Sequence, residues 1–274
     1  MVRATSPLRE ALELGIAELE AAAVDTPHLD AELMLAAVVG TDRAALHADP
    51  QQMLAADAAR RFDENVRRRV RREPVAYILG RAHFRELQLT VDHRVLIPRP
   101  ETEMLVELAE NRQRVLDVGT GSGAVALAIA AERTGVTVTG IDSSPGAIEV
   151  ARANAEALGL DVEFMIADLV VGGPYDLVVS NPPYVRDADW PGLAPEITLY
   201  EPEEALRGGP DGLDVIRRLV PAVAEVLRPG GLLGLEVGQG QSRAVEAIFE
   251  RSGLRLLETQ RDLAGIPRVV RGRR

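Results

Sequence analysis

The sequence predicts an α/β protein with a mostly parallel sheet, preceded by a small helical bundle. From residue 101 onward, short apolar runs typical of strands alternate with helical stretches, which is the pattern of a mostly parallel sheet. Residues 1–73 have helical periodicity throughout, whereas residues 74–100 change to strand-like alternation. We therefore expect an N-terminal helical domain over 1–73, a linker with a β-hairpin over 74–100, and an α/β domain over 101–274.

Three helix starts are expected in the N-terminal region, and each is marked by a residue that commonly caps a helix: Ser6, Thr26 before Pro27, and Asp49 before Pro50. The third start precedes an apolar stripe at helical spacing, formed by Leu54, Ala58, Phe62, Val66 and Val70. Gly40 is expected to end the second helix, and Pro74 the third. Such caps and stripes indicate a folded unit with its own core.

The linker is predicted to form its hairpin from Leu87–Val91 and Val95–Ile97, with Asp92-His93-Arg94 as the turn. Five strands are then expected in the α/β domain, with helices between them: RVLDV, VTVTGID, VEFMIAD, YDLVVSN and GLLGLEV.

The composition excludes several classes of site. Hydrophobic residues make up 46% and charged residues 27%, the balance of a globular protein rather than a disordered one. With 0 Cys there is no disulfide, thiolate metal site or Cys nucleophile. All 31 basic residues are Arg, which excludes a catalytic Lys. The 4 His residues are scattered, so we expect no metal site.

The net charge of −11 has the wrong sign for stable binding to nucleic acid. No apolar run reaches the roughly 18 residues that a membrane span needs. Arg9, Glu10 and Glu13 interrupt any apolar core of a secretory leader. We therefore expect a cytoplasmic protein without membrane contact. We also expect a monomer.

A glycine-rich loop follows the first strand of the α/β domain and leads into a helix; its residues are Gly119, Thr120, Gly121, Ser122 and Gly123. Such a loop brings backbone close to a ligand at a helix start. Asp142 ends the second strand, where a carboxylate can accept hydrogen bonds from both ribose hydroxyls. Asp168 and Leu169 end the third strand, where a nucleobase edge would lie. Asp117 precedes the loop and favours a ligand ammonium, which S-adenosylmethionine has and NAD lacks at that place.

The fourth strand leads into Asn181-Pro182-Pro183-Tyr184. Two consecutive prolines stiffen this exit and remove two backbone donors, so carbonyl groups remain available as acceptors. The side chain of Asn181 offers a further carbonyl. Rigid acceptors beside a methyl donor are suited to orient a planar NH₂ group for attack. The sequence therefore predicts an amino methyltransferase site at this strand end.

These motifs, in this order, resemble the protein-(glutamine-N5) methyltransferases of peptide chain release factors, the HemK/PrmC family. The resemblance covers nearly the whole chain. It rests on Pro74–Gly80, Ile97–Glu103, the DVGTGSG loop, Asp142, Ser180–Tyr184, Glu201-Pro202, Ala205-Leu206, Gly208-Gly209, Asp211–Leu213 and Asp262–Gly265. The NPPY motif alone is shared with adenine-N6 DNA methyltransferases, whereas RPETE combined with the Glu201–Leu213 block is far more specific.

The resemblance implies a class I S-adenosylmethionine-dependent methyltransferase fold (Rossmann-like) over the catalytic domain, 101–274. It implies methyl transfer from S-adenosyl-L-methionine to the side-chain amide nitrogen of a release-factor glutamine, expected to be that of the GGQ motif, with S-adenosyl-L-homocysteine as product. Residues Gly119–Gly123, Asp142, Leu169 and Asn181 would line the cofactor. Asn181, Pro182, Pro183 and Tyr184 would hold the glutamine, with Asn181, Pro182 and Tyr184 as catalytic residues. The helical domain would select the substrate.

Three alternatives remain at the level of the sequence. A nucleic-acid amino methyltransferase, acting on adenine N6 or guanine N2, would need a flipped base and usually a basic surface. A nucleotide-sensing module would not need an amide clamp. A dehydrogenase would bind NADH instead of S-adenosylhomocysteine.

Two further features have structural interpretations. The cluster Arg67, Arg68, Arg69, Arg71 and Arg72 is expected to be a solvated helix end, which suits the helix dipole. Docking of a nucleic-acid-like partner there is the less favoured interpretation. Trp190 and Tyr200 lie in a long connecting segment that is expected to shape the substrate pocket.

Overall fold

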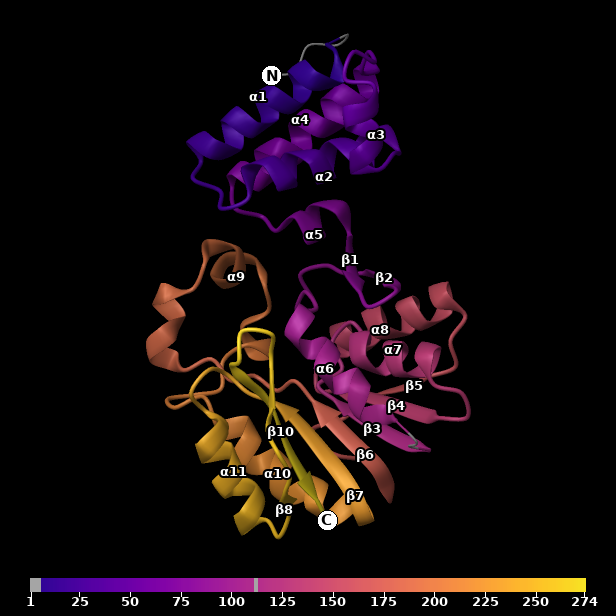
Figure 1. The fold of residues 1–274 in the computed structure, drawn as a ribbon, viewed down its shortest axis with the longest axis vertical. Helices are drawn as coiled ribbons and strands as arrows, with labels where there is room; N and C mark the ends of the chain where they lie inside the picture. The colour runs from indigo at the N-terminus through magenta and orange to yellow at the C-terminus, as the bar shows by residue number, and fades with distance from the viewer. Residues whose placement is uncertain (1–5, 111–112) are drawn as a thin grey trace. The chain divides into compact units, whose positions relative to one another are not determined.

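The computed structural model describes residues 6–110 and 113–274 and divides into two compact units (Figure 1). Unit 1 comprises Met1–Gly80 together with Ala194–Tyr200, and unit 2 comprises Arg81–Leu193 and Glu201–Arg274. Residues 1–5 of the expected helical domain, and 111–112 of the expected α/β domain, lie outside the described residues. The segment Ala194–Tyr200 belongs to unit 1 although its chain neighbours belong to unit 2, and nothing in the sequence patterns predicted this.

Unit 1 is helical. Its helices are α1 (Leu8–Ala21), α2 (Pro27–Val39), α3 (Arg43–Ala48), α4 (Ala56–Val70), α5 (Val75–Leu79) and α9 (Pro195–Tyr200). The predicted stripe on α4 is confirmed for Ala58, Phe62 and Val66, which are buried, whereas Val70 is exposed. A Cβ at Gly15 of α1 would stand 2.7 Å from the Phe62 ring, so this glycine lets α1 approach α4 closely.

The predicted helix boundaries are confirmed for α2 and wrong elsewhere. Thr26 is the N-cap of α2 and Gly40 its left-handed C-cap. The N-cap of α1 is Pro7 rather than Ser6, because Ser6 is buried and its carbonyl accepts a hydrogen bond from Leu54 N–H. Asp49 ends α3 instead of starting α4, whose N-cap is Ala55.

The arginine cluster on α4 is not a uniformly solvated helix end, and that expectation is wrong for Arg69. Only 5% of Arg69 is exposed. Its guanidinium pairs with Asp30 at 2.6 Å and with Glu196 at 2.7 Å. Arg72 pairs with the other oxygen of Glu196 at 2.8 Å. These arginines therefore connect α2, α4 and α9 inside unit 1.

Unit 2 begins with a two-stranded hairpin of β1 (Arg81–Phe84) and β2 (Leu87–Thr90). The prediction of a hairpin in the linker is confirmed, but Leu87–Thr90 is its second strand rather than its first. The predicted turn at Asp92-His93-Arg94 is present, closed by a hydrogen bond from Val95 N–H to the Asp92 carbonyl, but the strand predicted after it is wrong. Residues 92–97 form no strand, because the N–H of Ile97 donates to a carboxylate oxygen of Glu201 rather than to a neighbouring strand.

The main sheet contains all five predicted strands: β3 (Arg114–Val118), β4 (Thr137–Asp142), β5 (Glu163–Ile166), β6 (Tyr175–Ser180) and β7 (Leu227–Glu236). They are parallel, in the order β5-β4-β3-β6-β7. The antiparallel β10 (Pro267–Arg273) follows β7 and pairs with the short β8 (Arg255–Leu256) and β9 (Gln260–Arg261). From β3 the chain adds β4 and β5 on one side and then β6 and β7 on the other, so the strand order reverses between β3 and β6. Parallel α/β sheets bind ligands at such a point.

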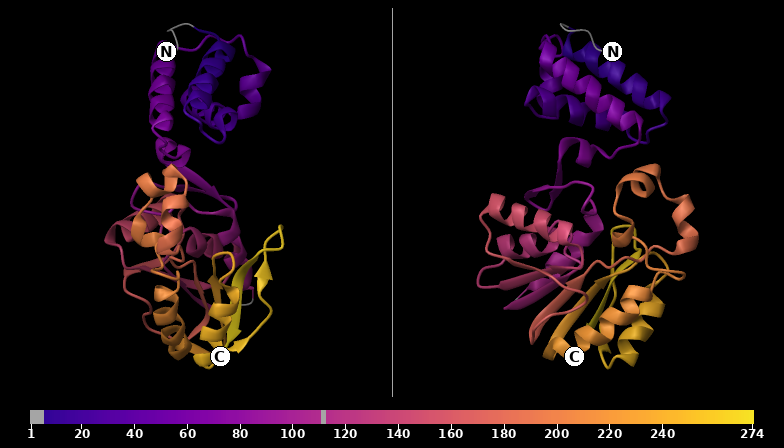
Figure 2. Two further views of the ribbon diagram at one scale, coloured as in Figure 1. Left: turned by 90° about the vertical axis from the view of Figure 1, so that its left-hand side faces the viewer. Right: turned by 180° about the vertical axis from the view of Figure 1, so that it is seen from behind.

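Helices cover both faces of this sheet (Figures 1 and 2). One face carries α6 (Glu103–Val106), α7 (Ala124–Glu132) and α8 (Pro145–Leu158), and the other carries α10 (Asp214–Val226) and α11 (Ser242–Arg251). Short 3₁₀ turns complete the unit: η1 (Pro100–Thr102), η2 (Glu107–Ala109), η3 (Asp187–Gly192) and η4 (Glu203–Ala205).

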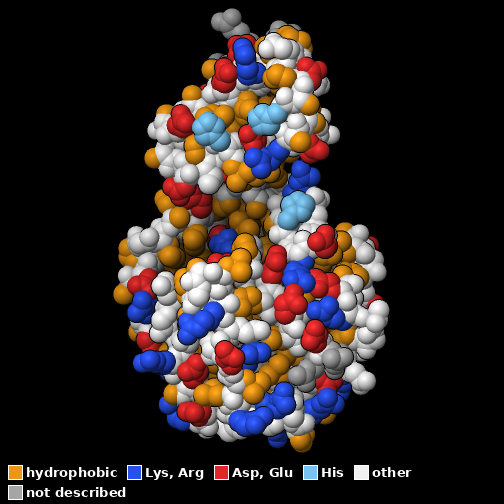
Figure 3. All heavy atoms as spheres, viewed as in Figure 1, with side chains coloured by type: hydrophobic (Ala, Val, Ile, Leu, Met, Phe, Trp, Pro, Cys, Tyr) orange, Lys and Arg blue, Asp and Glu red, His pale blue; other side chains and the backbone are white. Residues whose placement is uncertain are grey.

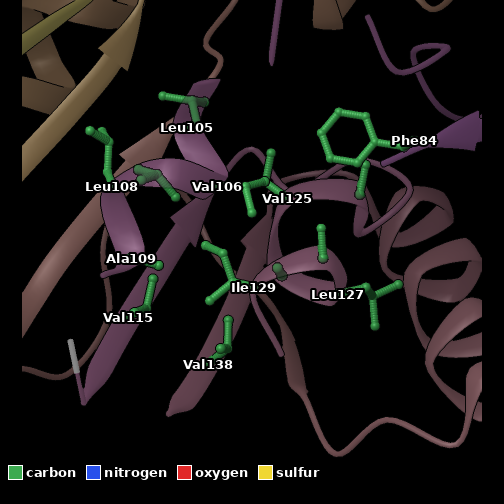
Figure 4. Packing of buried hydrophobic residues seen from close by; sticks show 14 of the residues in the cluster. Phe84, Leu105, Val106, Leu108, Ala109, Val115, Val125, Leu127, Ile129 and Val138 are labelled. Atoms are coloured by element: carbon green, nitrogen blue, oxygen red, sulfur yellow. The ribbon is translucent and has the colours of Figure 1, made fainter. Parts of the chain in front are cut away.

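Two hydrophobic cores result, because successive strand residues point to opposite faces. Leu177 and Val179 of β6 belong to the core under α7, and Val178 belongs to the core under α10. Figure 4 shows Val125 and Ile129 of α7 in the first core, beside the sheet. The buried strands hold the loops at their carboxyl ends in fixed places. Among the described residues, no helix is long and apolar enough to cross a membrane.

Candidate active site

Unit 2 contains a cavity of about 250 Å³ at the carboxyl ends of β3, β4 and β6. Most of the predicted site residues line it: Asp117, Gly119, Thr120, Gly121, Ser122, Asp142, Asp168, Leu169, Asn181, Pro182 and Pro183. The structure thus brings the glycine-rich loop, three strand-end carboxylates and the NPPY segment together. Gly123 and Tyr184 are not among the lining residues.

The glycine-rich loop connects β3 to α7. Gly119 and Gly121 have φ of +70° and +55°, a left-handed conformation that a residue with a Cβ rarely adopts. Gly123 has φ of +83° as well, and it has a further role, since a Cβ there would stand 3.0 Å from Leu127 and 3.1 Å from Phe164. The first two glycines therefore shape the cavity wall, and the third lets α7 pack closely on the sheet.

Asp142 is held by the backbone around it. Its Oδ2 accepts from Gly121 N–H at 3.0 Å and its Oδ1 from Ser144 N–H at 2.9 Å. Burial raises the pKa of Asp142 and outweighs these hydrogen bonds, which lower it. The carboxylate is therefore fixed in orientation, and its negative charge is poorly compensated within the cavity.

Asp117 is more deeply buried, with 2% exposure. Thr120 Oγ1 and Ala126 N–H both donate to its Oδ2, at 2.6 and 3.2 Å, and Oδ1 takes part in neither bond. Burial raises the pKa of Asp117 to about 7, and the nearby charge of Asp142 acts in the same direction. Two close carboxylates with raised pKa values form a site suited to a cation and to hydroxyl donors. The pyrophosphate of a dinucleotide would be repelled there.

The NPPY segment leaves β6 beside the glycine-rich loop. Ser180 Oγ donates to the Val118 carbonyl at 2.8 Å, which joins the ends of β6 and β3. A Cβ at Gly119 would lie 3.9 Å from the Asn181 carbonyl oxygen. The side-chain NH₂ of Asn181 donates to Thr102 Oγ1 at 3.1 Å, so its amide oxygen Oδ1 points away from Thr102.

Tyr184 lies behind the cavity lining rather than in it. Its hydroxyl donates to Glu236 Oε1 at 3.1 Å, and its backbone carbonyl accepts from Gln241 at 2.9 Å. Burial raises the pKa of Tyr184, and the adjacent charge of Glu236 raises it further. The phenol is therefore protonated at neutral pH and supports the loop from behind.

The RPETE block and Glu201-Pro202, for which the sequence suggested no individual role, contact each other. Glu201 is 7% exposed, and its carboxylate accepts from Ile97 N–H and from the Arg99 guanidinium. The RPETE and EP motifs are thereby joined at the cavity rim, where Arg99 and Pro202 are lining residues. Glu201 is more than 100 residues from Ile97 and Arg99 in the sequence, so no local sequence pattern predicted this contact.

Some lining residues were not predicted from the sequence, among them Arg94, Thr102, Glu204 and Arg218. Arg218 of α10 pairs with Asp168 at 2.5 Å. Of the long connecting segment, Pro202, Glu204 and Ala205 line this cavity, whereas Trp190 and Tyr200 do not. The Trp190 ring lies under the Arg207 guanidinium, 4.8 Å from it, and the Tyr200 hydroxyl donates to the Arg71 carbonyl in unit 1.

The fold and the site together define a methyltransferase-type α/β protein. Residues 100–209 match the family described as methyltransferase small domain, and residues 10–80 match the PrmC N-terminal domain. A solved methyltransferase from Pyrococcus furiosus shares the fold, with a TM-score of 0.50 at 18% identity over 68% of this chain and 88% of that one.

Full-length relatives give the particular family. The chain is 42% identical to a release factor glutamine methyltransferase from Caulobacter vibrioides, over 93% of this chain and 92% of that protein. It is 41% identical to another so named from Rhodospirillum rubrum, over 96% of this chain and 84% of that protein. The chain therefore belongs to the release factor glutamine methyltransferase family.

Proposed function

We propose that this chain transfers a methyl group from S-adenosyl-L-methionine to the side-chain amide nitrogen of a glutamine in peptide chain release factors. The observation that carries the proposal is the orientation of Asn181, whose amide oxygen is free to accept while its NH₂ is engaged by Thr102. Membership in the family supports the same substrate class.

The cavity residues fit this cofactor in charge and hydrogen bonding. Asp142 would accept from the ribose hydroxyls, and Asp117 would accept from the ammonium group through Oδ1. The backbone of Gly119–Gly123 would approach the amino-acid part, and Asp168 with Leu169 the adenine. When bound, the cofactor supplies a methyl group on a positively charged sulfur.

The protein's part in the reaction is to orient the glutamine. An amide nitrogen is a poor nucleophile, because its lone pair is delocalised into the carbonyl. Acceptors at Asn181 Oδ1 and the Pro182 carbonyl would hold both N–H bonds on one side and direct the lone pair toward the methyl group. These hydrogen bonds strengthen as positive charge develops on nitrogen, so they stabilise the transition state. The methylated nitrogen is strongly acidic and loses its proton without a dedicated base.

We assign substrate selection to unit 1. A glutamine side chain is too common to be chosen by a short clamp alone, so contacts elsewhere must discriminate. Unit 1 contains neither the cavity residues nor the NPPY segment, yet it has a core of its own.

The test is incubation of the chain with isotope-labelled S-adenosylmethionine and unmethylated release factor, followed by peptide mapping by mass spectrometry. We expect one methyl group on a single glutamine. The Asn181→Ala variant is the control, and its rate should fall about a hundredfold to a thousandfold while it still binds S-adenosylhomocysteine. In a parallel incubation with nucleic acid in place of release factor, label on the nucleic acid and none on glutamine would support the adenine-N6 or guanine-N2 alternative.

A further inference from the structure

A buried chain of hydrogen bonds lies behind Asn181, and the reaction as described above does not use it. Thr102 and Glu236 are 5% and 2% exposed. Thr102 Oγ1 donates to Glu236 Oε2 at 2.7 Å, and Asn181 Nδ2 donates to Thr102 Oγ1 at 3.1 Å. The Tyr184 hydroxyl donates to the other Glu236 oxygen. A carboxylate is thus buried two hydrogen bonds away from the proposed substrate clamp.

The sheet register explains why these residues meet. β6 and β7 are parallel neighbours that pair Ser180 with Leu235, so the next residues, Asn181 and Glu236, leave the two strands side by side. Thr102 closes the group from η1, in the RPETE motif. The structure thus brings Thr102 and Glu236, the last residue of β7, into one hydrogen-bonded group, which neither surrounding sequence suggests alone.

The number of protons that each group can donate determines which way the hydrogen bonds run from Asn181 to Glu236. Glu236 accepts at both oxygens, from the Thr102 hydroxyl and from the Tyr184 hydroxyl, so the single hydroxyl proton of Thr102 is given to Glu236. The oxygen of Thr102 then has only lone pairs to offer, and the Asn181 amide must present NH₂ to it. The amide carbonyl Oδ1 consequently faces the opposite way. With the amide turned over, NH₂ would face the NH₂ of a substrate glutamine, and neither group could accept.

We propose that Glu236 and Thr102 are positioning residues that set the rotation of the Asn181 amide, so that Oδ1 is presented to the substrate amide. The proposal rests on the proposed function. Glu236 acts as an acceptor, because a group that receives the Thr102 proton allows only one direction of hydrogen bonding from Glu236 to Asn181. The Tyr184 hydroxyl satisfies the second oxygen and holds the carboxylate in place.

Burying the carboxyl group of Glu236 is costly, which argues that the group has a use. Burial raises the pKa of Glu236 above its ordinary value, and hydrogen bonds from Thr102 and Tyr184 offset this only in part. An apolar residue here would avoid this desolvation cost.

Thr102→Val removes the hydroxyl at nearly constant shape, and Thr102→Ser keeps it. We expect Thr102→Val to lower kcat about tenfold to hundredfold. This is the range found in metal enzymes when a group that only orients an active-site side chain is removed. S-adenosylhomocysteine affinity should stay within about twofold, and Thr102→Ser should restore most of kcat. Thr139→Val is the matched control, since Thr139 is also a buried threonine but does not line the cavity.

A double-mutant cycle separates positioning from general support. If Thr102 acts through Asn181, Thr102→Val should slow single-turnover methyl transfer in the wild-type background and have no further effect on Asn181→Ala. Equal losses in both backgrounds, or wild-type kcat in Thr102→Val, would overturn the proposal.

The same variants give a readout that needs no substrate. In ¹⁵N NMR spectra of the whole protein, the Asn181 side-chain NH₂ signals, assigned by their absence in Asn181→Ala, should exchange slowly in wild type and rapidly in Thr102→Val. Unchanged exchange would also count against the proposal. If wild type fails to methylate any release factor while these signals behave as expected, the proposed function is wrong and the positioning role stands.

Discussion

Asp142 is a single residue whose role can be tested by binding alone. Its two oxygens are oriented by Gly121 and Ser144, so the carboxylate is preorganised toward the cavity. We expect Asp142→Ala to weaken S-adenosylhomocysteine binding by about 1.5–3 kcal/mol, the range for hydrogen bonds to a charged group. Isothermal titration calorimetry measures this directly. The exposed Asp189, paired with Arg186, provides the control variant Asp189→Ala. Unchanged affinity in Asp142→Ala would mean that the ribose lies elsewhere.

Asp117 gives a prediction of pH dependence. Burial raises its pKa to about 7, so in the free protein it becomes protonated as the pH falls below that value. A bound ammonium group favours the ionised form, which means that protonation must be reversed on binding. We therefore expect S-adenosylhomocysteine affinity to fall as the pH is lowered from about 7.5 to 5.5, by at most about tenfold per pH unit.

Asp117→Asn separates this effect from the titration of Asp142, whose pKa is also raised. The variant should bind more weakly at pH 7.5 and show a shallower pH dependence. Identical slopes in the variant and the wild type would show that Asp117 does not contact the ammonium group.

At the level of elements, α9 depends on an ion-pair cluster that is local to unit 1. Burial raises the pKa of Glu196, but hydrogen bonds from its own backbone, Arg69 and Arg72 more than offset this, so the pKa lies below its ordinary value. The charge of Glu196 is therefore stabilised by the two arginines of α4 and its C-terminal turn.

Arg69→Met should destabilise unit 1, because it leaves Asp30 and Glu196 partly buried without their shared partner. Breaking a buried ion pair from one side costs about 3–5 kcal/mol. Arg67→Met is the control on the same helix, since Arg67 is exposed and lies 3.9 Å from Asp63. Urea denaturation should show a lower midpoint for Arg69→Met alone. Equal midpoints for the two variants would contradict a structural role for the cluster.

The elements also show what could be predicted from the sequence. The five parallel strands were predictable, because buried strands have continuous apolar runs. The strand ends then brought Asp117, Asp142 and Asn181 to one cavity. The cluster around Arg69 was not, because charged residues at a helix end have the same local pattern whether solvated or buried. The bond between Thr102 and Glu236 joins residues 134 apart in the sequence, a pairing set only by strand order.

Charged side chains of both signs are mixed on the face of the molecule that Figure 3 shows, and the net charge is −11. Tight binding to nucleic acid requires clustered basic residues that displace counterions. The net charge, together with the mixed pattern on this face, therefore favours a protein substrate over the base-methylating alternative.

Unit 2 is expected to bind the cofactor without unit 1, whereas selection of the release factor should need unit 1. Deleting residues 1–80 removes the helical unit except α9 and keeps every cavity residue. We expect the truncated protein to bind S-adenosylhomocysteine with nearly unchanged affinity. Methylation of intact release factor should fall sharply, whereas methylation of a short glutamine-containing peptide should fall much less.

The deletion also removes the partners of α9, so a loosened connecting segment could by itself slow the reaction. Full-length Arg69→Met is the control for this effect, because it disturbs α9 while the helices remain. The quantity to compare is the ratio of kcat/KM for release factor to that for the peptide, measured below the melting transition of each variant. If unit 1 selects the substrate, this ratio drops in the truncated protein and stays near the wild-type value in Arg69→Met. A truncated protein that loses both activities in equal proportion would show that unit 1 only supports the catalytic unit, because selection of the substrate must act on one substrate more than on the other.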